Sequence, residues 1–227
     1  MRVDNAAMSG ANGKPRRDFD DPLRFFPRAI TKSYSMWLTL TYPFVSVGRK
    51  LSIHYTCDLR RTIAHRVKFG DFLVIREHVW FTPGVPDEQR GEPLFIIEDR
   101  CCIDAHCQLS ARNCIHLEPD VMISRGVLLM DHSHEYENVS VPIRDQGKTE
   151  GGRIRIEQGC WIGHGAAIVA SKGDLVLGRN CVVGANSVVT KSAPPYSVLS
   201  GNPARIVKQF DPGKGVWVLG AVPAVQG

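Results

Sequence analysis

The chain has 227 residues, enough for one domain with appendages, and its 43% of hydrophobic residues can build a continuous core. Its net charge of +5 comes from dispersed basic residues, so it lacks the clustered basic face that nucleic-acid binding needs. No run of 18 apolar residues could form a transmembrane helix, and the N-terminus has no basic-then-apolar signal pattern. The expected location is the reducing cytosol, with peripheral attachment at the inner membrane face left open.

The first segments predict a tail and a cap. Residues 1–18 are rich in Asn, Gly, Lys and Arg and are expected to be a disordered tail. Residues 19–46 are rich in aromatic side chains. A short helix is predicted between Pro27 and Pro43, with four side chains on one face: Ile30, Tyr34, Trp37 and Leu38. We interpret this segment as a cap over the open end of the following domain. The alternative is a membrane-surface foot carrying three basic residues: Arg24, Arg28 and Lys32.

Residues 47–207 repeat every six residues. Large aliphatic residues recur at Ile156, Ile162 and Ile168, and a small residue follows most of the large ones by four positions. This period fits neither a helix nor an alternating strand, but it fits a short strand followed by a turn, three to a coil. The sequence therefore predicts an all-β fold, a solenoid of about five coils with triangular cross-section, with one large and one small residue pointing inward on each face.

The cysteines follow the same repeat. Five of the seven stand in the small inward position: Cys57, Cys101, Cys107, Cys160 and Cys181. Buried free cysteines behave as small hydrophobic residues, and we predict that role for these five. Cys102 and Cys114 fall outside this position, and neither has C-x-x-C spacing, so no metal site is expected.

A polar excursion interrupts the repeat between residues 130 and 153 and begins Asp131-His132-Ser133-His134-Glu135-Tyr136. A loop that leaves a rigid solenoid is a natural place for function. From the residues alone, His132 and His134 could form a solvated pair, a metal-binding pair or a general base, with Glu135 as a candidate to orient an imidazole. Cys102 is a further candidate, as a nucleophile, although the sequence places no base beside it.

Several motifs after the excursion carry a family resemblance: Cys160-Trp161-Ile162-Gly163, Val183-Gly184-Ala185, Val189-Thr190-Lys191, Pro194-Pro195-Tyr196 and Gly201-Asn202-Pro203-Ala204-Arg205. In this order they resemble the hexapeptide-repeat acyltransferases, in the branch of the maltose, galactoside and colanic-acid O-acetyltransferases. The resemblance covers residues 47–208. It implies a left-handed parallel β-helix that forms a homotrimer and binds acetyl-CoA between neighbouring subunits.

The resemblance also assigns residues. It implies His132 as the catalytic base, with His134 as the runner-up or an acceptor contact. Asp104 and Trp161 correspond to residues near the acceptor. The implied coenzyme A contacts are His164, Ala185, Thr190, Lys191, Arg205 and Lys208.

The function that the resemblance implies is acetyl-CoA-dependent O-acetylation of a carbohydrate hydroxyl, in a surface polysaccharide or its precursor sugar, by direct transfer. Two alternatives remain from the sequence. One is a γ-type carbonic anhydrase, which needs three histidines around zinc on the same solenoid, and the other is a non-catalytic scaffold. Residues 208–227 are expected to be a tail that either packs on the solenoid or a neighbouring subunit or stays mobile.

Overall fold

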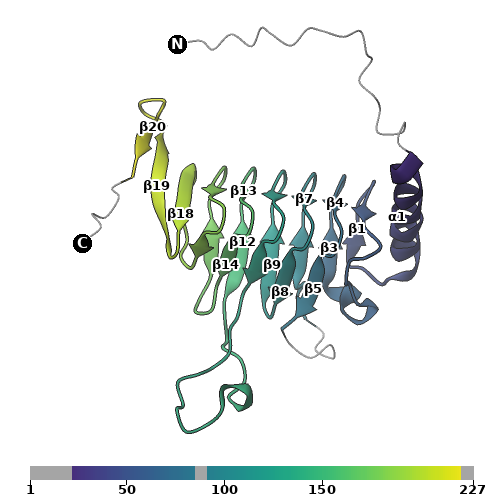
Figure 1. Ribbon diagram of the computed structural model, residues 1–227, viewed down its shortest axis with the longest axis horizontal. Coiled ribbons are helices and arrows are strands. Elements are labelled where there is room, and N and C mark those ends of the chain that lie inside the picture. Colours follow the sequence, from purple (N-terminus) through teal and green to yellow (C-terminus); the bar gives the residue numbers. More distant parts are fainter. Residues whose placement is uncertain (1–21, 85–90, 221–227) are drawn as a thin grey trace.

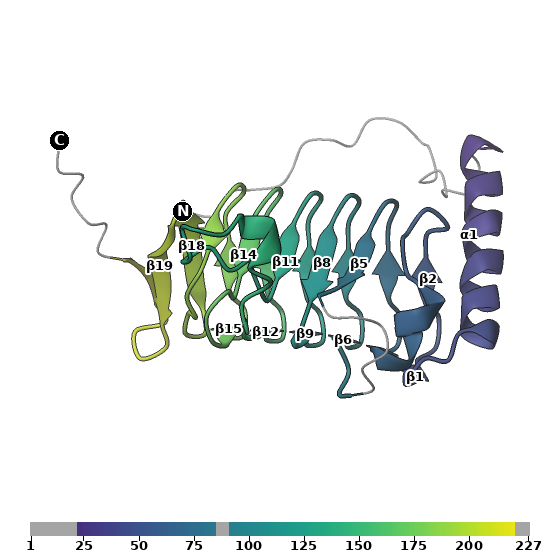
Figure 2. The ribbon, with the colours of Figure 1, turned by 90° about the horizontal axis from the view of Figure 1, so that it is seen from below.

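A computed structural model describes residues 22–84 and 91–220. Three sheets of parallel strands form the three sides of a rod, and most coils contribute one strand to each sheet. The stacked coils are visible in Figures 1 and 2. The first sheet contains, in order, β1 (Ser46–Val47), β3 (Val67–Phe69), β6 (Phe95–Ile97), β9 (Cys114–Leu117), β12 (Arg153–Ile156) and β15 (Leu175–Leu177). The fold is therefore the predicted β-helix, but its six-stranded first sheet gives one coil more than the sequence indicated.

The other two sheets complete the coils. The second contains β2 (Ser52–Ile53), β4 (Val74–Ile75), β7 (Cys102–Ile103), β10 (Met122–Ile123), β13 (Trp161–Ile162), β16 (Val182–Val183) and β18 (Ser197–Gly201). The antiparallel strands β19 (Ala204–Asp211) and β20 (Val216–Leu219) extend it. The third contains β5 (Trp80–Pro83), β8 (Gln108–Ala111), β11 (Leu128–Met130), β14 (Ala167–Val169) and β17 (Val188–Val189). Within the described residues, two short 3-10 helices, Arg61–Arg66 and Ile143–Asp145, lie between strands.

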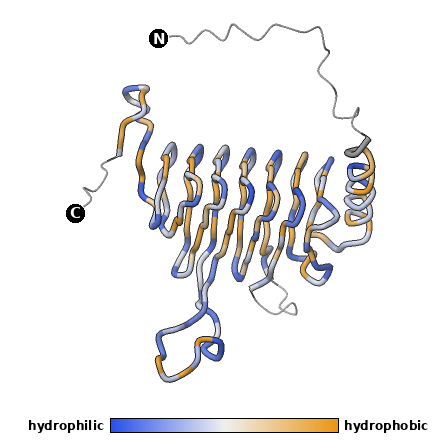
Figure 3. Tube along the Cα trace, viewed as in Figure 1, coloured by the Kyte–Doolittle hydropathy of each residue, from blue (hydrophilic) through white to orange (hydrophobic). Residues whose placement is uncertain are grey.

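The core is the interior of the rod, and it is built from the six-residue repeat. Ile103, Ile123 and Ile162 stand in register on neighbouring strands and are almost fully buried, as are the other large repeat residues from Ile53 onward. Figure 3 shows hydrophobic and hydrophilic residues alternating along each coil. Because no coil can bury its inner face alone, stacking on the next coil supplies most of the stability.

The cysteines in the small inward position are buried, as predicted, and all seven are free. Burial raises the pKa of the Cys57 and Cys107 thiols to about 11 and that of Cys101 to about 12. These thiols are therefore protonated and unreactive near neutral pH. Cys102 is half-buried on β7, while Cys114 is buried on β9.

Helix α1 (Pro22–Thr41) lies across the N-terminal end of the rod (Figure 2). The predicted break at Pro27 is wrong, because Pro27 lies inside the helix, where it removes only one backbone donor near the N-terminal end. The helix is held by Ser35, whose buried hydroxyl accepts from the Ile53 amide at 2.9 Å and donates to the Thr31 carbonyl at 2.8 Å. Leu38 is fully buried beside it, so α1 covers the open end of the core.

Two segments leave the regular coils. Residues 131–152 form a loop between β11 and β12 that projects from the rod in Figure 1. At the C-terminal end of the rod, β19 and β20 form an antiparallel hairpin that continues the second sheet, so residues 208–219 of the expected tail lie mostly in strands. The predicted disordered residues 1–18 lie outside the described part of the chain. No described helix is long and apolar enough to cross a membrane.

Candidate active site

Asp131 is a fully buried carboxylate at the end of β11, where the chain leaves the rod. Its Oδ1 accepts from the backbone N–H of Arg112 at 2.7 Å. Its Oδ2 accepts from the N–H groups of Asn113 and Cys114 at 2.8 and 2.9 Å. The turn between β8 and β9 thus fixes the position of the carboxylate with three backbone donors. The buried carboxylate has its hydrogen-bond partners beside it, and it can accept one more hydrogen bond and so orient another donor.

That further donor is His132, whose Nδ1 lies 2.9 Å from Asp131 Oδ1. Since the carboxylate accepts hydrogen bonds, the proton of a neutral imidazole is assigned to Nδ1, which leaves the lone pair on Nε2. In residues 22–84 and 91–220 no hydrogen bond engages Nε2. The His132 side chain is only 6% exposed, so its orientation is fixed. This arrangement can take a proton from a hydroxyl group at Nε2.

Gly84, in the loop after β5, covers the imidazole. A Cβ at this position would lie 2.7 Å from His132 Cε1 and 2.9 Å from the Cβ of Arg112, so only glycine fits without movement. The Gly84 amide donates to the Ala111 carbonyl at 2.6 Å, and the Gly84 carbonyl accepts from Lys148 Nζ at 3.0 Å. Two loops that are far apart in the sequence therefore meet at His132.

His134 and Glu135 take no part in this pair. His134 forms a β-bridge with Lys148 across the excursion, and its side chain is exposed. The hydrogen bond of Glu135 within the described residues is from its backbone N–H to the Gly147 carbonyl. Asp131, and not Glu135, orients the imidazole of His132.

Two of the predicted coenzyme A contacts lie on the same long edge of the rod as His132, the edge at which the strands of the third sheet end. Thr190 and Lys191 follow β17, and β17 lies two strands from β11 in the third sheet. At about 4.8 Å between neighbouring strands, they lie roughly 10 Å along the rod from the start of the excursion. Both side chains are exposed, and the Lys191 ammonium is suited to bind a phosphate group.

The predicted acceptor residues lie on another part of the rod. Asp104 is in the turn between β7 and β8, where its carboxylate accepts from the Ala105 amide at 2.7 Å and pairs with Arg76 at 3.6 Å. Trp161 is on β13, and its indole N–H donates to Ser124 Oγ at 3.0 Å. Neither side chain contacts His132 through a hydrogen bond or ion pair within the described chain.

The remaining predicted coenzyme A contacts are also away from His132. His164 and Ala185 are exposed in turns that lead from the second sheet to the third. His132 instead follows the end of β11, on the long edge of the rod where the strands of the third sheet end. Arg205 and Lys208 are exposed on β19 at the C-terminal end. In a single copy of the chain, the predicted coenzyme A contacts are thus divided between two long edges of the rod and its C-terminal end.

Solved structures share this fold. A variant of AntD, an N-acyltransferase from Bacillus cereus, in complex with dTDP-4-amino-4,6-dideoxyglucose and coenzyme A, has a TM-score of 0.64 at 17% identity. The match covers 78% of this chain and 89% of that chain. Galactoside acetyltransferase in complex with coenzyme A has a TM-score of 0.50 at 18% identity, with 86% of each chain covered. No protein-family model matches the chain.

Curated sequences are also similar to the chain. It is 26% identical over 170 residues to the probable acetyltransferase Rv3034c of Mycobacterium tuberculosis, covering 74% of this chain and 51% of that protein. It is 26% identical over 133 residues to the putative lipopolysaccharide biosynthesis O-acetyl transferase WbbJ of Escherichia coli, covering 56% of this chain and 66% of that protein. The chain is thus similar in sequence to curated acetyltransferases and shares its fold with solved acyltransferase structures. It spans about half to two thirds of the length of these relatives.

The sequence analysis did not identify two residues of this site, Asp131 and Gly84. Asp131 is visible as the residue before His132, but its partners come from the turn at residues 112–114, on the preceding coil. Gly84 lies near the N-terminal side of a loop, and nothing in its neighbourhood in the sequence points to residue 132. Both contacts depend on how coils stack.

The zinc alternative needs three histidines that converge. Among the described residues, no group of three His, Cys, Asp or Glu side chains could hold a metal ion. His132 is bonded to Asp131, whereas His78 and His106 stack on each other at 5.0 Å in turns between the second and third sheets.

Proposed function

We propose that this protein transfers an acetyl group from acetyl-CoA to a hydroxyl of a carbohydrate, in a surface polysaccharide or its precursor sugar. The observation that carries the proposal is the Asp131–His132 pair, with a 2.9 Å contact and a carboxylate fixed by three backbone donors. Sequence similarity to curated acetyltransferases and the O-acetyl transferase name of the Escherichia coli relative support the choice of reaction and acceptor.

The proposed reaction is a direct transfer. His132 Nε2 takes the proton of the acceptor hydroxyl while its oxygen attacks the thioester carbonyl, and Asp131 stabilises the imidazolium that forms. The tetrahedral intermediate then collapses, the carbon–sulfur bond breaks, and the imidazolium returns the proton to the leaving thiolate. The products are the acetyl ester and free coenzyme A.

We infer that the working unit is a homotrimer in which each site lies between two copies. The support is the placement of the proposed ligands. Thr190 and Lys191 lie on the His132 edge, but His164 and Ala185 lie on the other edge of the third sheet. A neighbouring copy would bring its second edge against the His132 edge of the first, as cyclic symmetry permits.

The test is a thiol-release assay with acetyl-CoA against a panel of sugars and amines, using wild type, His132→Ala and His134→Ala. His132→Ala is expected to lose about 10² to 10⁴ in kcat, the usual contribution of a general base, while still binding coenzyme A. His134→Ala serves as the matched control, since its side chain is exposed on the same loop, and it should keep most of its turnover.

Three outcomes would reject parts of the proposal. Equal losses in the two variants would remove the distinction between the histidines. Unchanged turnover in His132→Ala with coenzyme A still bound would reject His132 as the base, and binding without turnover in wild type would favour a scaffold. Turnover with amines alone would replace the hydroxyl acceptor by an amino sugar.

A further inference from the structure

Helix α1 carries a large apolar surface on the side that does not pack on the rod. We define its outer stripe by five exposed residues that recur along one face: Phe26, Ile30, Met36, Trp37 and Leu40. The packing side, with Ser35 and Leu38, points to β2. The exposed fraction reaches 77% at Leu40. The ordinary surface of a monomer has few exposed apolar faces of this kind, and such a face usually marks an interaction site.

Positive charge borders the outer stripe. Helix α1 has no Asp or Glu in its sequence, and Arg28 and Lys32 lie one turn apart beside the stripe. Lys32 has no ion-pair partner in the described part of the chain. An apolar face bordered by cationic side chains is typical of helices that lie in the interface of a membrane.

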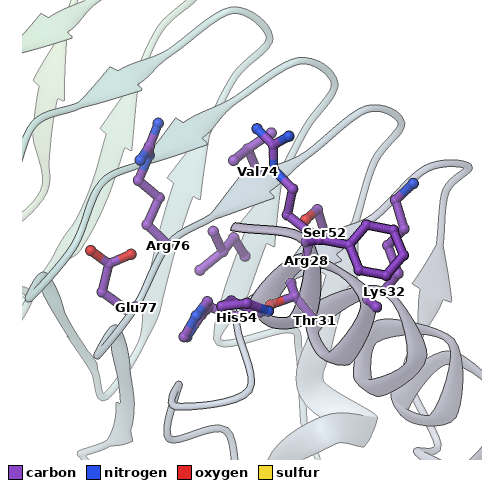
Figure 4. Close-up of a pocket in the computed structure, with 12 residues that line it drawn as sticks. Arg28, Thr31, Lys32, Ser52, His54, Val74, Arg76 and Glu77 are labelled. Atoms are coloured by element: carbon purple, nitrogen blue, oxygen red, sulfur yellow. The ribbon is translucent and has the colours of Figure 1, made fainter. Parts of the chain in front are cut away.

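A pocket of about 530 Å³ opens between α1 and the outer surface of the second sheet (Figure 4). Arg28 and Lys32 line it from the helix, and Arg76 lines it from the turn after β4. Glu77 is the acidic residue among those that line it. Three cationic side chains around a cavity are suited to a phosphate group, and Phe25 lies at the same cavity.

We propose that the α1 end of the rod docks on a membrane surface that contains anionic phospholipids. The outer stripe enters the boundary between headgroups and acyl chains, and the pocket holds a lipid phosphate against Lys32 and Arg76. The helix lies on the membrane without crossing it. Since α1 covers the end of the rod, the rod stands on the surface (Figures 1 and 2). His132 follows β11, so it lies several coils away from the membrane.

Charge favours a lipid surface over a second copy of this chain as the occupant. Two copies packed stripe to stripe would place Arg28 and Lys32 of both helices at one interface, with no acidic residue in α1 to compensate. An anionic membrane attracts each of these basic residues, which contributes about fivefold in partitioning per residue near the surface.

The test is flotation of the full chain with vesicles of phosphatidylcholine alone or mixed with phosphatidylglycerol. Wild type is expected to float with the mixed vesicles and much less with phosphatidylcholine. The double variant Trp37→Ser/Leu40→Ser should lose at least about tenfold in partitioning, because two apolar anchors are removed. The matched control is Trp217→Ser/Leu219→Ser on the opposite hairpin, whose side chains are equally exposed, at 51% and 77% against 50% and 77%.

A second pair of variants tests the charge. Lys32→Ala should reduce binding to the mixed vesicles by about fivefold. Lys214→Ala, on the C-terminal hairpin, should leave it unchanged. Thiol release with a free sugar acceptor should be the same in all four variants, so failure of membrane docking is distinguishable from failure of the proposed reaction.

Three results would overturn the proposal: no flotation of wild type, equal losses in the α1 and hairpin variants, or binding that does not depend on phosphatidylglycerol. Sedimentation without vesicles provides a further check. A doubling of the oligomer mass that Trp37→Ser/Leu40→Ser abolishes would assign the outer stripe to a second copy of this chain instead.

Discussion

The pairing of Asp131 with His132 determines which nitrogen can react. Three backbone N–H groups fix the Asp131 carboxylate, and this carboxylate accepts a hydrogen bond from Nδ1, which leaves Nε2 as the acceptor of a neutral imidazole. Neutralising the carboxylate would remove the preference for this tautomer and the stabilisation of the imidazolium.

Asp131→Asn is therefore expected to lower kcat by about 10² or more, with little change in KM for acetyl-CoA. Asp174→Asn is the matched control, because Asp174 also accepts a backbone N–H, from Arg153 at 2.7 Å, without contacting a histidine. Steady-state kinetics of both variants check this. A loss confined to KM in Asp131→Asn would argue that the carboxylate serves binding alone.

Gly84 acts on the same imidazole by shape. Gly84→Ala should lower kcat at least about tenfold, because the new Cβ would have to displace the His132 ring or the Arg112 backbone. Gly91→Ala, in the same loop, should be almost neutral, since its Cβ would meet Arg66 only at 3.6 Å. Equal activity of the two variants would show that the ring position is not critical.

Within a strand, the side chains that point into the rod and those that point outward differ sharply in their exposed fraction. Ile123 and Met122 are neighbours on β10, but Ile123 is 2% exposed and Met122 is 53% exposed. Ile123→Ala should reduce the free energy of unfolding by about 2–5 kcal/mol because it leaves a cavity between coils. Met122→Ala should change it by no more than about 0.5 kcal/mol. Urea unfolding measures both, and similar values would contradict the assignment of the inner face.

The sequence predicted what depends on the period and missed what depends on stacking. Ile123 and Ile162 could be placed inside from the six-residue repeat alone, since the repeat dictates the inner face. The start of α1 was predicted too late, at Pro27. The helix includes Pro27, because a proline near the start of a helix removes few hydrogen bonds. Asp131 was missed, because its donors come from another coil and only the registration of coils brings them together.

At the scale of the whole molecule, we propose that two copies of the chain make each site. His132 lies on one long edge of the third sheet, together with Thr190 and Lys191, and Ala185 lies on the other, so neither edge alone has the base and all of the proposed coenzyme A contacts. Two variants with defects on different edges would then be able to complement each other within one oligomer.

The most direct measurement is thiol release after co-expression of His132→Ala with Ala185→Trp, each inactive alone. In randomly mixed trimers, one site in about four pairs an intact His132 edge with an intact Ala185 edge, so roughly a quarter of wild-type activity should return. Activity that never exceeds that of the separate parents, although the mixed oligomers form, would show that each copy holds a complete site and would contradict the account.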